Sequence, residues 1–220
     1  MSCKWTAGLD FLLAVRAVFM IQPPKGASMI EATKQFQPEL FRNYLRILAR
    51  VALRSGGAMQ NKIDASDIVQ DALLQAVVAL PQFRGQTDHE FAAWLRAILA
   101  NKLTDAARHF ARKKRDVALE RSIREKLEDS ASRLERQIPA DATSPSQRVM
   151  QNETARCVAE CLAALPRDQQ LVVELHHLSD YSVAEIAQRM NKSKPAVAGL
   201  LRRGLENLRE SLKQKERELR

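Results

Sequence analysis

Residues 180–209 read DYSVAEIAQRMNKSKPAVAGLLRRGLENLR, and this stretch decides the fold of the C-terminal part of the chain. Ala187 is small, Asn191 accepts a positive φ more readily than most residues, and Val197 is β-branched. A small, a turn-compatible and a β-branched residue in this order suit two closely packed helices joined by a short turn. The pattern therefore predicts a helix-turn-helix, with an ordinary helical hairpin as the alternative.

The second helix of this pair has one apolar stripe and an outer face with short side chains. At about 100° per residue, the stripe contains Val197, Leu201, Leu205, Leu208 and Leu212. Short side chains near the N-terminus would let the helix lie deep in a groove, while Arg202 and Arg203 reach phosphates or a base edge. We therefore expect a duplex-reading surface formed by Ser193, Lys194, Ala196, Ala198, Gly199, Arg202 and Arg203.

Apolar spacings of three and four recur along the chain, and no period-two pattern persists, so we expect an all-α fold. The polar stretch 130–146 contains Pro139 and Pro145 and has no apolar period, which predicts a flexible linker. Two small helical domains are then expected, at 29–129 and 147–220. The expected helices are 36–55, 64–80, 88–115, 117–129, 147–164, 167–178, 182–190 and 194–216.

The N-terminal region contains an apolar run from Phe11 to Ile21 that Arg16 interrupts. The run is too short to span a bilayer, and no small-residue cleavage site follows it, so we expect no membrane insertion. A second methionine, Met29, stands just before the first well-patterned helix. We therefore expect residues 1–28 to be an extension that is either disordered or the result of a mis-assigned start.

The net charge of +9 and the pI near 9.8 favour a polyanionic partner. Cys3, Cys157 and Cys161 form no secretory disulfide framework, which favours the reducing cytoplasm. Cys157 and Cys161 have two histidines downstream and resemble half of a zinc site. Because the C-x-x-C spacing is missing, we expect buried thiols and no metal.

The stretch 64–80 combines an acidic side with a wide apolar side. The apolar side contains Ile68, Val69, Ala72, Leu73, Ala76, Val77 and Leu80. Asp64, Asp67, Gln70 and Asp71 fall on the opposite side. No histidine or second carboxylate cluster accompanies them, which argues against a catalytic pocket. We expect a docking face for a basic partner, and simple solvation is the alternative.

A loop with Phe83 and Arg84 leads into a long helix with a polar ridge. The ridge contains Asn101, Asp105, Arg108 and Arg112. Basic side chains beside an aromatic ring suit opened or single-stranded DNA, because bases stack on the ring while arginines hold the backbone. We expect Trp94, in contrast, to belong to the core.

These segments together resemble the sigma-70 family, specifically its extracytoplasmic-function (ECF) group. The resemblance rests on D-A-S-D-I-V-Q-D from residue 64, F-R-G from 83, W-L-R-A-I-L-A-N-x-x-x-D from 94, L-P-x-x-x-x-x-V-x-x-L from 165 and the helix-turn-helix. It implies a bacterial RNA polymerase specificity subunit that directs promoter recognition and transcription initiation. Such a subunit is not an enzyme and needs no cofactor.

The resemblance also implies partners and roles for the candidate residues. Asp64, Asp67, Gln70 and Asp71 would dock on the β′ coiled coil of core RNA polymerase, whose β flap is a second contact. Phe83, Arg84, Asn101, Asp105, Arg108 and Arg112 would meet the minus-ten element of promoter DNA. The helix-turn-helix would read the minus-thirty-five element, and an anti-sigma factor is a further partner that the group allows.

One departure from the family pattern concerns the reading helix. Ala198, Gly199 and Leu200 stand where the family commonly has a basic residue, Ser and Arg, so a relative's minus-thirty-five sequence does not transfer to this chain. A stand-alone helix-turn-helix regulator is the alternative function, although it would not need the acidic helix. A nucleic-acid enzyme is a third class, which no convergent catalytic set supports.

Overall fold

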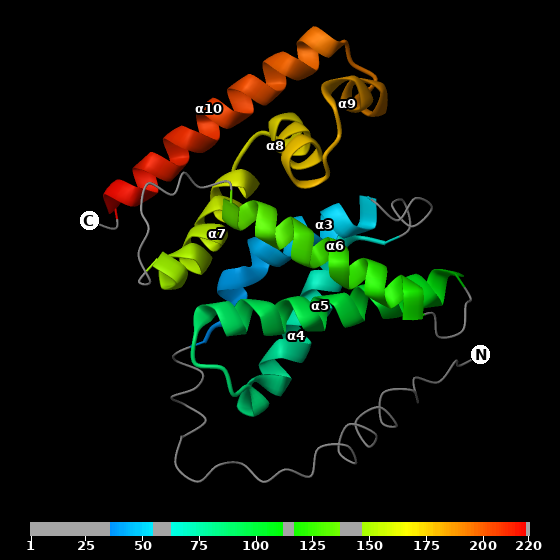
Figure 1. The fold of residues 1–220 in the computed structure, drawn as a ribbon, viewed down its shortest axis with the longest axis vertical. Coiled ribbons are helices and arrows are strands. Elements are labelled where there is room, and N and C mark those ends of the chain that lie inside the picture. Colours follow the sequence, from blue (N-terminus) through cyan, green and yellow to red (C-terminus); the bar gives the residue numbers. More distant parts are fainter. Residues whose placement is uncertain (1–35, 55–62, 112–116, 137–146, 219–220) are drawn as a thin grey trace, which may run out of the picture.

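The computed structural model describes residues 36–54, 63–111, 117–136 and 147–218, and every regular element in these ranges is helical (Figure 1). The predicted all-α fold is therefore confirmed for these ranges, while the expectation for residues 1–28 lies outside them. None of these helices combines the length and apolar character that crossing a bilayer requires. The longer elements are α3 (Arg42–Arg54), α4 (Ala65–Ala79), α5 (Asp88–Ala111), α6 (Val117–Arg136), α7 (Gln147–Ala163), α8 (Arg167–Val173), α9 (Val183–Met190) and α10 (Lys194–Glu218). Short turns are η1 (Pro38–Phe41), η3 (Leu80–Gln82) and η4 (Glu174–Leu178).

The central helix of the N-terminal half is α3, because α4, α5, α6 and α7 all pack against it (Figure 1). Ile47 and Leu48 are consecutive and both fully buried, which requires neighbours on more than one side of the helix. The remaining side of α3 carries Arg46, Arg50 and Arg54, one helical turn apart. This arginine row faces the C-terminal half of the molecule.

Side-chain caps fix the N-termini of α4 and α5. The Asp64 carboxylate accepts a hydrogen bond from the Ser66 amide at 2.8 Å. At α5, the Glu90 carboxylate accepts from the Thr87 amide at 3.1 Å, and the Glu90 amide donates to Thr87 Oγ1 at 3.2 Å, which is a capping box. Hydrogen bonds from the Gln86 and Thr87 amides lower the pKa of Glu90. The caps explain why these helices begin within a residue of their predicted starts.

Helix α6 is longer than predicted and ends at Arg136. Its apolar stripe contains the buried residues Ile123, Leu127, Ala131 and Leu134, and the last two lie past the predicted end at residue 129. The sequence analysis missed this continuation because the residues after 129 are mostly polar, although one of them, Ser130, is buried in the helix packing. The predicted linker at 130–146 was therefore wrong over its first seven residues, and residues 137–146 lie outside the described ranges.

The two predicted helical domains pack directly against each other through α7. This helix contacts α3, α5 and α6 on one side and α10 on the other. Val158, Ala159 and Leu162 of α7 belong to the same buried cluster as α3. An ion pair between Arg133 of α6 and Asp180 before α9 adds a polar contact between the halves. The N-terminal half and part of the C-terminal half thus share one apolar core, whereas the helix-turn-helix has a smaller core of its own.

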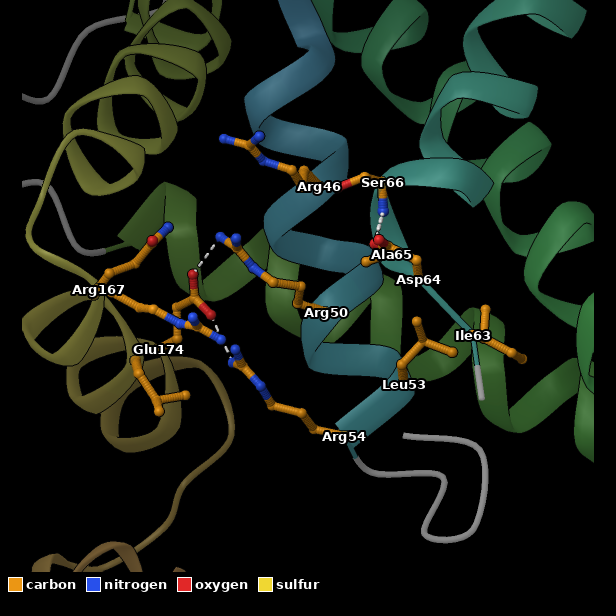
Figure 2. A pocket seen from close by; sticks show the side chains of 12 residues that line it. Arg46, Arg50, Leu53, Arg54, Ile63, Asp64, Ala65, Ser66, Arg167 and Glu174 are labelled. Carbon is orange, nitrogen blue, oxygen red and sulfur yellow. Dashed lines mark hydrogen bonds and ion pairs between the residues drawn. The ribbon is translucent and has the colours of Figure 1, made fainter. Parts of the chain in front are cut away.

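A buried ion pair also joins the halves (Figure 2). Glu174 lies in η4, a π-helical turn that continues α8, so the single helix predicted at 167–178 changes its winding there. The Glu174 side chain is 0% exposed, and its two oxygens accept hydrogen bonds from Arg50 and Arg54 of α3 at 2.6 Å each. One carboxylate from the C-terminal half therefore binds two arginines of the N-terminal half and neutralises one of their two positive charges.

The predicted helix-turn-helix is formed by α9 and α10. Ser182 and Glu185 make a capping box at the start of α9. Asn191 adopts the left-handed conformation with φ 50° and ψ 46°, which lets the chain turn immediately after α9. Ile186 and Val197 are fully buried between the two helices. The three positions that predicted the motif therefore have the roles that we expected.

Helix α10 crosses α8 at an unusually short distance. A Cβ atom at Gly204 would lie 3.0 Å from Val173 Cγ2 and 3.3 Å from Gln169 Cβ, so only glycine fits without a shift. Next to this crossing, Asn207 Nδ2 donates to Gln169 Oε1 at 2.9 Å. The predicted apolar stripe of α10 continues on both sides of it, with Val197 and Leu208 buried.

Candidate docking surface and nucleic-acid interface

The acidic side of α4 is exposed, as the pattern predicts. Asp67 and Asp71 are both exposed, and the structure gives them no ion pair within the described ranges. Gln70 Oε1 accepts a hydrogen bond from Arg42 Nη1 of α3 at 2.8 Å, which fixes its side chain. Asp64 is exposed too, but its carboxylate caps the helix. The two open carboxylates are therefore Asp67 and Asp71.

The same side of α4 continues into an exposed apolar surface. Leu74 is 56% exposed, Val77 55% and Val78 68%. The sequence pattern places Val77 on the apolar side of the helix, but Val77 is not buried, because Val69, Leu73 and Ala76 already fill the part of α4 that faces the core. The apolar side was too wide for all of it to be buried against α3 and α5. We use the term α4 docking face for Asp67, Gln70, Asp71, Leu74, Val77 and Val78.

Phe83 is part of an aromatic cluster at the end of α4. Its ring centroid lies 5.1 Å from that of Phe36, 5.2 Å from that of Phe91 and 5.1 Å from that of Trp94. Edge-to-face and tilted contacts at these distances stabilise the loop. Trp94 is half-buried against the same core, which confirms its predicted place. Because Phe83 is also half-buried, only part of its ring is open to a base.

The loop after Phe83 is tightly folded. A Cβ atom at Gly85 would lie 2.3 Å from Phe83 Cζ and 2.9 Å from Glu90 Cβ, so this position requires glycine. Arg84 is exposed, and its Nη1 donates to the carbonyl oxygens of Pro81 at 2.9 Å and Phe83 at 3.3 Å. The guanidinium of Arg84 therefore lies along the loop, and its N–H groups other than those of Nη1 remain available to a ligand.

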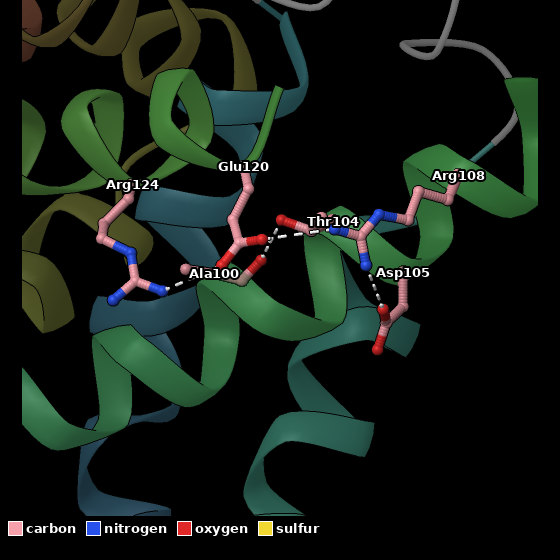
Figure 3. A network of polar contacts seen from close by, with 6 residues as sticks. All are labelled: Ala100, Thr104, Asp105, Arg108, Glu120 and Arg124. Atoms are coloured by element: carbon pink, nitrogen blue, oxygen red, sulfur yellow. Dashed lines mark hydrogen bonds and ion pairs between the residues drawn. The ribbon is translucent and has the colours of Figure 1, made fainter. Parts of the chain in front are cut away.

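The polar ridge of α5 is less basic than predicted (Figure 3). Asn101 and Asp105 are exposed, but Arg108 is held at the interface with α6. Arg108 pairs with Asp105 at 3.5 Å and with Glu120 of α6 at 3.2 Å. The sequence could not show this contact, because Glu120 belongs to the next helix. The ridge member Arg112 lies outside the described ranges.

The start of α10 presents the predicted reading surface. Ser193 Oγ accepts from the Ala196 amide at 3.3 Å, so this residue caps the helix in addition to being exposed. Lys194, Ala196 and Ala198 are exposed on the first turns. A Cβ atom at Gly199 would contact only the Arg203 guanidinium, at 3.5 Å from Nη1.

The two arginines of this surface differ in their surroundings. Both Arg202 and Arg203 are exposed. Arg202 Nη1 pairs with Glu206 one turn later at 2.9 Å, whereas the Arg203 guanidinium lies over Gly199. Exposed pairs within one helix stabilise by only about 0.3–0.5 kcal/mol, so Glu206 would release Arg202 easily to a phosphate or a base.

The cysteines of α7 have the character of core residues. Cys161 is buried, Cys157 is half-buried, and both are free thiols. Burial raises the pKa of the Cys161 thiol to about 11. Among the described residues, no group of three or more histidines, cysteines and carboxylates is arranged to hold a metal ion.

Comparison with known proteins gives matches to both halves of the chain. Residues 40–115 match the family described as Sigma-70 region 2, and residues 155–208 match the family described as Sigma-70, region 4. The first range contains the α4 docking face and the α5 ridge. The second contains the helix-turn-helix. The order of the two matches is the order of the two helical domains.

Two curated proteins illustrate the similarity. The chain is 28% identical over 153 residues to the ECF RNA polymerase sigma factor SigW of Bacillus subtilis, which covers 70% of this chain and 78% of that protein. It is 26% identical over 159 residues to the ECF RNA polymerase sigma factor SigD of Mycobacterium tuberculosis, which covers 72% of this chain and 68% of that protein. Each alignment covers more than two thirds of this chain and of the relative.

Proposed function

This chain belongs to the ECF group of the sigma-70 family, and we propose that it acts as an RNA polymerase sigma factor through three separate surfaces. Its function is promoter recognition and transcription initiation, which it performs by binding and not by catalysis. The observation that carries the assignment is the match of both domains, in order, to sigma regions two and four. A stand-alone regulator would need only the second match.

The α4 docking face is the proposed contact with the β′ coiled coil of core polymerase. Its acidic half, with Asp67 and Asp71, suits a basic partner surface, and its apolar half suits desolvation on contact. An exposed apolar group beside charged residues is typical of a protein interface. The second domain would contact the β flap, and the sigma factor would work in the cytoplasm with the polymerase.

The loop at Phe83 and the ridge of α5 are the proposed contacts with the minus-ten element. Arg84, Asn101 and Asp105 are exposed and can offer donors and acceptors to separated bases. The exposed part of the Phe83 ring can support a base. Because Arg108 is paired with Glu120, we assign it to holding α5 against α6 unless DNA displaces that carboxylate.

The experiment that tests this function is run-off transcription with core RNA polymerase on genomic fragments. We expect discrete transcripts only when both the core enzyme and this protein are present. Their start sites should share minus-ten and minus-thirty-five elements. Transcripts that are independent of the protein, or binding to DNA as a dimer without the polymerase, would contradict the assignment.

We expect Arg202→Ala or Arg203→Ala to weaken binding to minus-thirty-five duplex DNA. A lost contact with a base edge should cost roughly 1–3 kcal/mol and relax the preference at one base pair. A lost phosphate contact should instead weaken all sequences alike and lower the salt dependence by about one ion. Titrations at two salt concentrations separate these results. Arg209→Ala, on the same helix and also exposed, is the matched control and should bind like the parent.

Gly199→Leu should separate groove entry from folding. The new side chain meets only the flexible Arg203 guanidinium, and leucine favours a helix over glycine by roughly 0.5–1 kcal/mol. Thermal unfolding should therefore show no loss of stability, whereas duplex binding should be lost because the side chain obstructs the groove. If this variant binds DNA normally, α10 is not the reading helix.

A further inference from the structure

We propose that the pocket between α3 and α8 binds a phosphorylated small molecule of nucleotide size. The pocket has a volume of about 640 Å³ and lies where the two halves of the molecule meet. Its walls come from α3, from the start of α4, and from α8 with η4. Figure 2 shows the side chains that line it, with the arginine row of α3 beside Glu174. This site adjoins the start of α4 but contains none of the residues of the α4 docking face or of the reading surface of α10.

The lining of the pocket carries an excess of positive charge. Arg46, Arg50, Arg54 and Arg167 face two carboxylates, those of Asp64 and Glu174. Both carboxylates already have partners, because Asp64 caps α4 and Glu174 binds Arg50 and Arg54. Within the described part of the chain, Arg46 and Arg167 form no ion pair, and Arg46 donates only to the neutral Asn43 side chain, at 3.0 Å. Two positive charges therefore remain to be neutralised.

Three buried donors of the lining also lack acceptors. Arg46 Nε, Arg50 Nε and Gln170 Nε2 are inaccessible to solvent and have no hydrogen-bond partner among the described residues. Buried donors without acceptors are uncommon in folded proteins, because each loses its hydration without compensation. Phosphate oxygens are strong acceptors that match the geometry of a guanidinium group. A phosphorylated ligand would supply the missing negative charge, and a rotation of these side chains would bring their donors to its oxygens.

The surroundings of Arg50 support the same conclusion. Its pKa is lowered from its usual value, chiefly by burial. Glu174 opposes this shift, but the nearby charges of Arg54 and Arg46 add to it. One buried carboxylate is therefore insufficient for this group of arginines, and a second anion would be stabilised strongly in the pocket.

The size and apolar walls of the pocket indicate more than a bare phosphate ion. Leu53, Ile63 and Leu171 form an apolar part of the lining. Small-molecule sites commonly have volumes of about 300–1,000 Å³, with apolar walls and a few polar groups. An orthophosphate ion would leave most of this space unfilled. A phosphorylated molecule with an apolar or planar portion fits both parts of the lining.

Binding at this pocket would link the two halves of the sigma factor. The pocket exists only while η4 packs on α3 and holds α8 opposite it, so a ligand held there would favour the packed arrangement over a separated one. It should also raise the melting temperature, because a ligand that binds only the folded state stabilises it.

The test measures thermal unfolding and calorimetric binding of the full chain with ADP, pyrophosphate, adenosine and sulfate at equal ionic strength. We expect ADP and pyrophosphate to raise the melting temperature, whereas adenosine and sulfate do not. Tighter binding of ADP than of pyrophosphate supports a ligand of nucleotide size, whereas equal binding of the two would overturn that proposal, because the apolar walls would then contribute nothing. No effect of ADP or pyrophosphate at millimolar concentration would overturn it, as would an equal effect of sulfate.

Two variants and one control connect binding to the pocket. Arg46→Gln should lower the affinity for ADP by about tenfold, because it removes a charge-assisted contact without touching the Glu174 pair. Gln170→Leu should lower it severalfold while leaving the charge unchanged. Arg121→Gln removes one exposed arginine from α6 and should have no effect. Unchanged ADP affinity in both pocket variants would overturn the proposal, as would protection by random duplex DNA in the absence of protection by ADP.

Discussion

Glu174→Ala should lower the free energy of unfolding by about 3–5 kcal/mol, since it removes one partner of a buried ion pair. The substitution leaves Arg50 and Arg54 largely buried, with 24% and 14% of their side chains exposed, and without their shared carboxylate. It also leaves two like charges side by side on α3. The loss should be visible in urea denaturation followed by circular dichroism.

The matched control is Glu206→Ala. Glu206 also binds an arginine, but in an exposed pair within α10, so its removal should change stability by less than about 0.5 kcal/mol. A loss as small as this at Glu174 would contradict the prediction. It would mean that η4 separates from α3 in solution and that water already surrounds the Glu174 carboxylate. Scattering measurements of the molecular dimensions would then detect the separated halves.

Reversing two charges on α4, with Asp67→Lys and Asp71→Lys together, should weaken binding to core RNA polymerase by a few kcal/mol. Both side chains are exposed and point away from the core, so the fold should survive. If a basic surface of the partner faces them, the double variant replaces two attractions by two repulsions. The measurement is the affinity for purified core polymerase, with run-off transcription as a second readout.

The control for this variant reverses two acids at the same spacing on another helix. Glu125→Lys with Asp129→Lys changes the net charge equally, and both residues are exposed on α6. This control should bind core polymerase like the parent. Equal affinities for the two double variants would reject the docking role of α4, because the effect would then reflect total charge and not a contact.

Local chemistry made the helix-turn-helix predictable from the sequence. Asn191 provides the left-handed turn, and Ser182 with Glu185 provides a cap, so neither feature depends on distant parts of the chain. The same holds for the cap at Glu90. These interactions connect residues within a few positions of one another, and the spacing along the chain is sufficient to identify them.

Contacts between distant segments escaped the sequence analysis. Glu174 is separated from Arg50 by 124 positions, and its partners became evident only when α8 was placed against α3. Val77 shows the same limit, because the helical pattern gives the width of an apolar side but not how much of it a neighbour covers. The continuation of α6 through Ser130 was missed because a small polar residue can pack as closely as alanine.

The direction of α10 depends on Gly204, because this residue has no Cβ atom that would press on α8. The crossing with α8 lies ten residues from the first residue of α10, Lys194, which is at the end that we propose to contact DNA. At about 1.5 Å of rise per residue, that segment is roughly 15 Å long. A side chain at residue 204 would press on Val173 and Gln169, and any tilt of α10 at this crossing displaces the start of the helix farther than the crossing itself. The alignment of α10 with DNA, as proposed, would therefore depend on a residue outside the reading surface.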